Sequence, residues 1–433
     1  MAKVTAEAST EAKRVVFVYL AANTLFTLAA SVIWGVNTLF LMGAGLTIFQ
    51  VMLANSAFTL GSLVFEVPTG VIADTIGRKA SFLIASGSLL VSTLLYVAGA
   101  QYSLGIWWFV GASVLIGFGY ACQTGAVDAW LVDALDHTGF ELPKERVFAW
   151  GGMAFGSAML VGTLLGGFLG QLNLSLPYVV RAGLLAVTFL FTAFMMRDLG
   201  FEPRPLKVST FASETRTIFS AGVNYGWRHR VVRPLLWVSL VGGVFFLFAF
   251  YSWQRYALNL LGREYVWVAG MLTAAFSLAG IGGNALVRRV MRDGDARRDP
   301  TKVLATCSAA MADIAFAVGL VGLVSRQPGL VPFAVASILW VIWGLMFGIT
   351  GPVRQAFLNE QIPSAQRATV LSLDSFFADA GGVAGQPALG WIAERYSIPA
   401  GWVIGSVFLG LSVPFYKRAG RAYREEREGH EGH

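Results

Sequence analysis

Residues 65–79 read FEVPTGVIADTIGRK, and this stretch indicates more about the fold than any other part of the chain. It ends one long apolar segment, carries charged residues through a turn and leads into a second apolar segment that starts at Ala80. Gly77 permits a tight turn because glycine adopts backbone conformations that other residues avoid. Arg78 and Lys79 suit the anionic headgroup region of a membrane, so the stretch predicts a turn between two spanning helices.

The composition of the whole chain also indicates a membrane protein. Hydrophobic residues make up 56% of the 433 residues and charged residues only 13%, against about 25% charged residues in a soluble protein. The apolar residues form twelve blocks, each long enough to cross a bilayer as a helix. We predict spans at residues 15–42, 48–73, 80–100, 106–134, 147–170, 176–196, 233–256, 266–287, 303–324, 331–357, 368–393 and 399–416.

The positive charges fall mainly on one side of these spans. With the N-terminus in the cytoplasm, all but five of the 32 Lys and Arg residues lie on the inner side; the exceptions are Arg181, Arg255, Arg263, Arg326 and Arg395. This asymmetry predicts a multi-pass protein of the inner (plasma) membrane with both termini in the cytoplasm. The net charge of +7 is therefore a topology signal, and we expect no nucleic-acid partner.

The chain divides into two similar halves. We predict an N-terminal six-helix bundle at 1–199, a cytoplasmic linker at 200–231, a C-terminal six-helix bundle at 232–416 and a cytoplasmic tail at 417–433. The linker carries an amphipathic stretch that favours a helix on the membrane surface, with an extended linker as the alternative. The motifs TGAVD (124–128) and TGPVR (350–354) end the fourth and tenth spans in the same register. The predicted fold class is therefore all-α, with twelve transmembrane helices in two bundles related by a pseudo-twofold parallel repeat.

The pattern G-x-x-x-D-x-x-G-R-K at residues 70–79 resembles the signature between the second and third helices of major facilitator superfamily transporters. The resemblance covers essentially the whole chain, residues 15–416, and implies a transporter that works by alternating access, not an enzyme. The lead-in at residues 66–70 looks like that of bacterial proton-coupled drug-efflux members. Such a protein would be a monomer in the lipid bilayer that moves a small-molecule substrate, uses protons as the coupling ion and needs no cofactor.

Span five departs from the efflux pattern. Residues 162–167 read GTLLGG, with glycines but without the proline of the antiporter motif. The direction of transport therefore stays open, and the alternative function is a carrier for an amphipathic metabolite or lipid, by uptake or by flipping.

The predicted conformational latch comprises Gly70, Asp74, Gly77, Arg78, Lys79 and Asp128. The resemblance implies that Asp74 contacts the N-terminus of span eleven, near residues 368–371, and holds the cytoplasmic side shut. In relatives an acid at the position of Asp128 pairs with the signature arginine, so we expect an Asp128–Arg78 pair. We expect Asp133, closer to the headgroups, to be a solvated terminal charge.

Glu66, Gly70 and Asp74 recur every four residues and so share one helical face. A charge facing lipid is costly, so this face should meet another helix. The resemblance implies span eleven, where residues 380–382 and Gly385 offer small side chains for close approach.

Ionisable groups inside spans are candidate functional groups because a membrane tolerates few of them. The proton-coupling candidates are, in order of preference, Asp379, Glu66, Asp374 and Asp313. Asp379 comes first because it falls near the middle of span eleven, where scarce water makes a carboxyl group take up a proton readily. Arg354, the repeat equivalent of Asp128, is expected to pair with Glu360 or Asp374. For each acid the alternative is a buried polar group satisfied by a neighbouring helix.

Spans one, four, seven and ten line the central cavity in this family. The candidate cavity residues are Asn23, Trp34, Asn37, Tyr120, Gln123, Phe245, Tyr251, Trp340, Trp343 and Arg354. Aromatic rings with a few polar groups suit a bulky, partly apolar solute, although such rings can also pack against lipid. The four histidines fall in predicted loops or the tail, so we expect neither a metal site nor a histidine-based active site.

Overall fold

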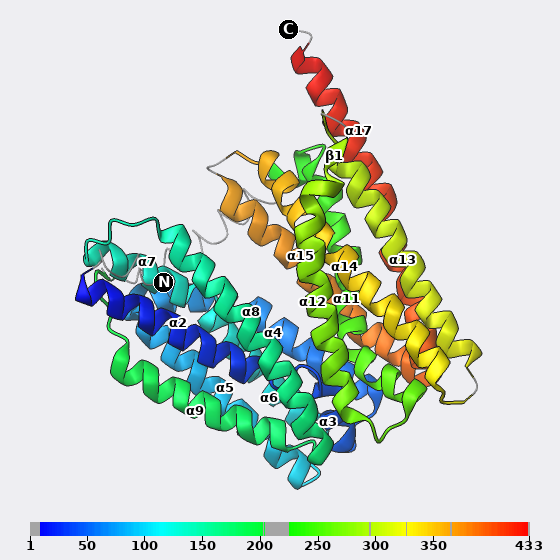
Figure 1. The fold of residues 1–433 in the computed structure, drawn as a ribbon, viewed down its shortest axis with the longest axis horizontal. Helices are drawn as coiled ribbons and strands as arrows, with labels where there is room; N and C mark the ends of the chain where they lie inside the picture. Colours follow the sequence, from blue (N-terminus) through cyan, green and yellow to red (C-terminus); the bar gives the residue numbers. More distant parts are fainter. Residues whose placement is uncertain are drawn as a thin grey trace. The chain divides into compact units, whose positions relative to one another are not determined.

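The computed structural model describes residues 9–201, 203, 225–293, 296–325, 327–363 and 366–431, mostly as long helices (Figure 1). The first half contains α2 (Thr10–Ser31), α3 (Asn37–Gly43), α4 (Ile48–Ile76), α5 (Arg78–Gln101), α6 (Ile106–Gln123), α7 (Ala126–His137), α8 (Lys144–Leu172) and α9 (Leu176–Met195). The second half contains α11 (Val232–Leu261), α12 (Val266–Val290), β1 (Arg292–Asp293), β2 (Ala296–Arg297), α13 (Pro300–Val324), α14 (Leu330–Glu360), α15 (Arg367–Arg395), α16 (Ile398–Gly410) and α17 (Ser412–Glu431).

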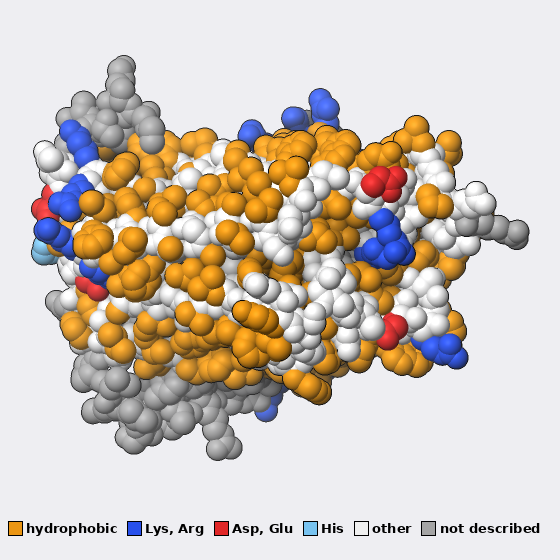
Figure 2. Space-filling model, turned by 90° about the horizontal axis from the view of Figure 1, so that it is seen from below, with side chains coloured by type: hydrophobic (Ala, Val, Ile, Leu, Met, Phe, Trp, Pro, Cys, Tyr) orange, Lys and Arg blue, Asp and Glu red, His pale blue; other side chains and the backbone are white. Residues whose placement is uncertain are grey.

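The predicted helical membrane architecture is confirmed. Among the described residues, eleven helical segments are long and apolar enough to cross a membrane. Helix α15 coincides with the predicted eleventh span but is not one of these, because polar residues such as Asp374, Asp379 and Gln386 interrupt its apolar ones. The two-residue strands β1 and β2 pair antiparallel and are a small exception to the all-α prediction. Hydrophobic side chains cover most of the face seen in Figure 2, as expected for a surface in contact with lipid.

Three predicted spans are interrupted. The first consists of α2 and α3, and the fourth consists of α6 and α7, which meet at Gly125 with a φ of 74°. The twelfth consists of α16 and the start of α17. At the first break Arg181 of α9, which is 1% exposed, donates from its guanidinium to the carbonyl of Ala30 (3.4 Å) and to Thr93 Oγ1 (3.1 Å). Ala30 lies in the last turn of α2, where carbonyls lack helical partners and the helix dipole favours a cation. Arg181 therefore stabilises the end of α2.

The chain packs as two compact units. Unit 1 comprises Met1–Leu46, Ala57–Lys207 and Val266–Met271, and unit 2 comprises Thr47–Ser56, Val208–Tyr265 and Leu272–His433. These boundaries differ from the predicted bundles because the first turns of α4 pack in unit 2 and the first turn of α12 packs in unit 1. In unit 2, Glu394 of α15 accepts a hydrogen bond from the Phe49 N–H (2.9 Å). In unit 1, a Cβ added at Gly270 would lie 2.8 Å from the Cα of Gly167 on α8.

The small residues of α15 pack against α11. A Cβ at Gly385 would overlap the carbonyl oxygen of Val244, and a Cβ at Gly243 would overlap that of Ala378. The missing side chains allow α11 and α15 to touch through their backbones. Helix α4 also reaches α15 next to these glycines, since the Ser56 hydroxyl donates to the Val383 carbonyl at 2.8 Å. The predicted contact of the Glu66–Gly70–Asp74 face with this surface stays a prediction.

The predicted linker helix falls on residues that lie mainly outside the described part of the chain, 204–224. The predicted tail is helical, because α17 runs to Glu431. Arg424 of α17 pairs with Asp299 at 2.7 Å, and Asp299 also caps α13 by accepting the Thr301 N–H at 2.9 Å. Burial alone would raise the pKa of Asp299, but the hydrogen bonds from Thr301 and Arg424 outweigh it and lower this pKa.

Neighbouring glycines of α11 provide a test of this packing. Gly243→Ala should lower the stability of the purified protein by about 1–3 kcal/mol, because the added methyl group forces α11 and α15 apart. Gly242→Ala is the matched control, since a Cβ there meets nothing within 4 Å, and alanine should leave stability unchanged or slightly raise it. Thermal unfolding in detergent measures both variants. Equal melting temperatures would contradict the close contact.

Candidate functional site

The turn between α4 and α5 lies at one end of unit 1. Gly77 adopts a φ of 119°, which suits only glycine, and Asp198 Oδ2 would lie 2.5 Å from a Cβ at this position. Asp198 Oδ1 accepts the Lys79 N–H at 2.9 Å, and Lys79 Nζ donates to the Ala193 carbonyl at 2.7 Å. Since Gly77 has no side chain to cap α5, the carboxylate of Asp198 supplies the cap.

Sequence reasoning missed Asp198. The available signal was an acid just after span six, at the same end of the predicted bundle as the signature turn. Burial raises the pKa of Asp198, while the Lys79 N–H and the charges of Lys79 and Arg78 lower it, and burial prevails.

Arg78 contacts two carboxylates, and neither belongs to Asp128. Its guanidinium lies 2.7 Å from Asp74 and 3.7 Å from Asp133. Asp128 instead accepts a hydrogen bond from the Tyr19 hydroxyl at 3.1 Å. The predicted Asp128–Arg78 pair is therefore wrong. Asp133, whose side chain is 34% exposed, is partly solvated as predicted and also lies within ion-pair distance of Arg78.

The spacing of the two acids explains this outcome. Asp128 and Asp133 lie five positions apart on α7, and two such residues point in different directions because each residue turns by about 100°. Asp128 consequently faces α2, while Asp133 faces the start of α5.

Elsewhere on α4, Glu66 and Gly70 are exposed, and a Cβ at Gly70 would meet nothing within 4 Å. The close approach expected at Gly70 is therefore absent from the described contacts.

Unit 2 contains a cavity of about 530 Å³. It is lined by α11, α13, α14, α15, α16 and α17. One wall is aromatic: Phe246 stacks on Trp343 with centroids 5.9 Å apart and on Phe347 at 4.9 Å. The polar groups include Ser239, Arg354 and Asp374. The cavity thus combines a large ring surface with a few groups that can orient a ligand.

The polar groups of this cavity form one network. Arg354 donates to both oxygens of Asp374 at 2.6 and 2.7 Å, to Ser239 Oγ at 2.5 Å and to the Leu235 carbonyl at 3.2 Å. Ser239 Oγ also lies 2.6 Å from Asp374 Oδ1. Of the two predicted partners of Arg354, Asp374 is confirmed as one. A bidentate pair neutralises both charges, which makes its burial tolerable in an apolar bundle.

Three of the candidate cavity residues in unit 2 line this cavity: Phe245, Trp343 and Arg354. Trp340 is not part of the lining; it packs in an aromatic cluster with Trp253 (4.5 Å) and Phe276 (4.7 Å). Tyr251 packs edge-on against Phe250 at 5.2 Å.

The candidates in unit 1 have varied surroundings. Asn37 is buried and donates to the Tyr178 hydroxyl at 3.2 Å. Tyr120 packs edge-on against Phe26 and Phe58, at 6.0 and 5.5 Å. The half-buried members are Asn23, Trp34 and Gln123. A role for these residues in substrate binding stays a prediction.

The four candidate coupling acids also differ. Asp374 lines the cavity of unit 2, Asp379 is half-buried on α15, and Asp313 and Glu66 are exposed on α13 and α4. Within the part of the chain that the structure describes, no three His, Cys, Asp or Glu side chains form a group that could hold a metal ion.

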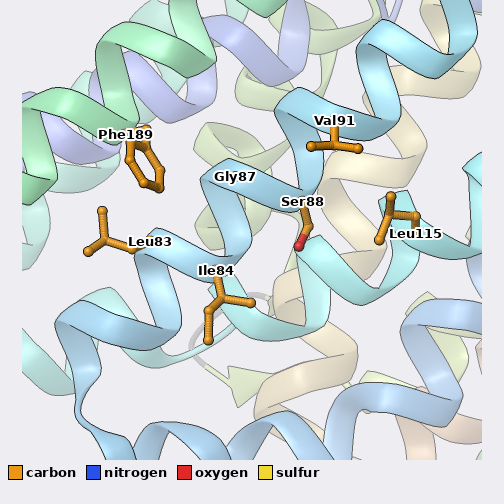
Figure 3. Close-up of a pocket in the computed structure, with 7 residues that line it drawn as sticks. All are labelled: Leu83, Ile84, Gly87, Ser88, Val91, Leu115 and Phe189. Atoms are coloured by element: carbon orange, nitrogen blue, oxygen red, sulfur yellow. The ribbon is translucent and has the colours of Figure 1, made fainter.

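A second hollow, of about 540 Å³, lies on unit 1 between α5, α6 and α9 (Figure 3). Its lining consists of Leu83, Ile84, Gly87, Ser88, Val91, Leu115 and Phe189. It offers no charged group to orient a solute, so the cavity of unit 2 is the better candidate site.

Comparisons with known proteins agree with this architecture. The family model described as Major Facilitator Superfamily matches residues 19–312. The tetracycline resistance protein, class B, of Escherichia coli is 25% identical over 374 residues, covering 84% of each chain. The class G protein of Vibrio anguillarum is 23% identical over 381 residues, covering 84% of this chain and 86% of the relative. A crystal structure of the nucleoside transporter NupG shares the fold, with a TM-score of 0.72, 14% identity, and coverage of 96% of this chain and 99% of that one.

The cap at the signature turn can be tested by substitution. Asp198→Ala should lower stability by about 1 kcal/mol, the usual cost of losing a helix cap. The control is Asp136→Ala, which removes an exposed ion pair with Lys144 and should cost less because solvent screens such pairs. Thermal unfolding in detergent compares the two. A larger loss for Asp136→Ala would contradict the capping role.

Proposed function

Because the chain belongs to the major facilitator superfamily, we propose that this membrane transporter exports amphipathic small molecules in exchange for protons, by alternating access. The observation that carries the proposal is the cavity of unit 2, with its aromatic wall and neutral Arg354–Asp374 pair. The tetracycline resistance proteins support it, since they match most of this chain. The charge asymmetry of the sequence supports cytoplasmic termini in an inner membrane.

The lining of the cavity supports a bulky, partly apolar substrate. Its volume of about 530 Å³ falls within the range of small-molecule pockets. Phe246, Trp343 and Phe347 offer ring faces on which a planar or lipophilic compound can be buried. Since Asp374 balances the charge of Arg354, the pair adds no net charge that would select strongly for an anion.

The same pair supports a coupling mechanism. A proton on Asp374 would remove the partner of Arg354 and change the pair from neutral to a charge of +1. A cationic substrate and a proton would then compete for the carboxylate, which is the exclusion that antiport needs. We therefore place Asp374 before Asp379, whose case rests on its depth in α15; Glu66 and Asp313 follow.

The signature turn supports a conformational latch. Asp74 and Arg78 form an ion pair next to Asp133, while Gly77 and Lys79 hold the turn against Asp198. We propose that this cluster controls the exchange between transport conformations and takes no part in substrate binding. The contact of Asp74 with the start of span eleven remains part of this proposal.

The second candidate function is a carrier for an amphipathic metabolite or lipid. The absence of proline from α8, where residues 162–167 read GTLLGG, favours it. Uptake or flipping would use the same cavity, so the direction of flux distinguishes the two functions.

Export and coupling can be tested with the purified protein reconstituted into the membrane of proteoliposomes that have an acidic interior. We expect wild type to accumulate tetracycline only while the pH gradient is present. Asp374→Asn should still exchange labelled for unlabelled drug but fail to accumulate it, because the variant has no carboxyl group to take up a proton. Asp379→Asn should retain accumulation, and Asp136→Asn is the surface control. Accumulation by Asp374→Asn with its loss in Asp379→Asn would make Asp379 the coupling acid, and gradient-independent flux of an anionic metabolite would favour the second function.

If the cluster is a latch, a substitution in it should impair transport but not substrate binding. Asp74→Asn should slow transport strongly while leaving substrate affinity within about tenfold, or about 1.4 kcal/mol. Binding by fluorescence titration and transport in proteoliposomes give the two values. Loss of binding with unchanged conformational exchange would contradict the latch.

A further inference from the structure

A cavity of about 350 Å³ lies at one end of unit 1, apart from the proposed transport site. It is formed by the first turns of α2, the middle of α7 and the residues that follow α9. Its lining consists of Thr10, Glu11, Arg14, Val15, Val18, Trp130, Met195, Arg197 and Leu199.

The lining separates into a charged part and an apolar part. Val15 and Val18 are buried, and the Trp130 indole donates to the Arg197 carbonyl at 2.7 Å, which holds the chain after α9 against α7. Arg14 and Arg197 are both exposed. The cavity is therefore amphipathic, with side chains that can cover a hydrocarbon chain next to two guanidinium groups.

Among the residues that the structure describes, the two guanidinium groups have no counter-ion. Within the described ranges, neither Arg14 nor Arg197 makes an ion pair, although Glu11 lines the same cavity. Guanidinium groups pair well with phosphate oxygens, which they can bind through two N–H groups at once. The site therefore has unused capacity for a phosphate.

The position of the cavity in the fold indicates which phosphate compound fits. Helix α2 begins at Thr10 and α9 ends at Met195, so the cavity lies where two spanning helices leave the hydrocarbon layer. Lipid headgroups lie at this depth, and basic pockets between helices are suited to anionic ones. Inorganic phosphate would leave the apolar part of the cavity unused.

We propose that this cavity binds one anionic phospholipid, with the phosphate between Arg14 and Arg197 and the upper part of an acyl chain against Val15, Val18 and Met195. The bound lipid would bridge the start of α2 and the end of α9. The inference is independent of the transported substrate, because these residues lie outside the cavity of unit 2.

Native mass spectrometry of the full-length protein, with added dioleoyl phosphatidylglycerol or dioleoyl phosphatidylcholine, tests the proposal. Wild type should retain one phosphatidylglycerol in clear preference to phosphatidylcholine. The double variant Arg14→Gln/Arg197→Gln should bind this lipid about tenfold more weakly, since each basic residue near an anionic headgroup contributes to affinity. The control is Lys13→Gln/Arg146→Gln, which removes the same charge from residues outside the cavity lining and should retain the lipid.

Two further measurements keep the test decisive if the double variant is poorly folded. Met195→Trp fills the exposed apolar part while both arginines remain, and it should also weaken phosphatidylglycerol retention. Inorganic phosphate at millimolar concentration should not displace the lipid. Equal retention by wild type and both cavity variants, or full displacement by inorganic phosphate, would overturn the proposal.

Discussion

A charge buried among membrane-spanning helices must be balanced by nearby oxygen atoms, because the surrounding hydrocarbon offers no water. Two arginines meet this constraint in different ways. Arg354 pairs with the carboxylate of Asp374, and Arg181 uses the carbonyl of Ala30 at the end of α2. Each contact ties together separate helices, so the placement of charge and the packing of the bundles depend on each other.

Glycine has a complementary role in this packing. Gly243 and Gly385 let α11 and α15 meet through their backbones, and this contact brings Asp374 of α15 within reach of Ser239 on α11. Larger side chains at these positions would separate the two helices and leave Arg354 without part of its network. The cavity of unit 2 therefore depends on small residues that do not themselves bind a ligand.

The two halves use equivalent positions differently. Asp128 and Arg354 end the TGAVD and TGPVR motifs, yet Asp128 meets the neutral hydroxyl of Tyr19, whereas Arg354 meets a carboxylate. Divergence of the repeat has thus replaced a hydrogen bond from a neutral hydroxyl with an ion pair at the equivalent position.

The sequence by itself determined the helical membrane class, the approximate spans and the signature turn, because hydrophobic length and glycine chemistry act locally. It also limited the partners of Arg354 to two acids, since charges inside apolar spans are few. The tertiary structure alone decided that Arg78 contacts Asp133, that Asp198 caps α5 and that the small surface of α15 meets α11. These contacts depend on the rotation of each helix about its axis, and that rotation is set by packing against neighbours distant in the sequence.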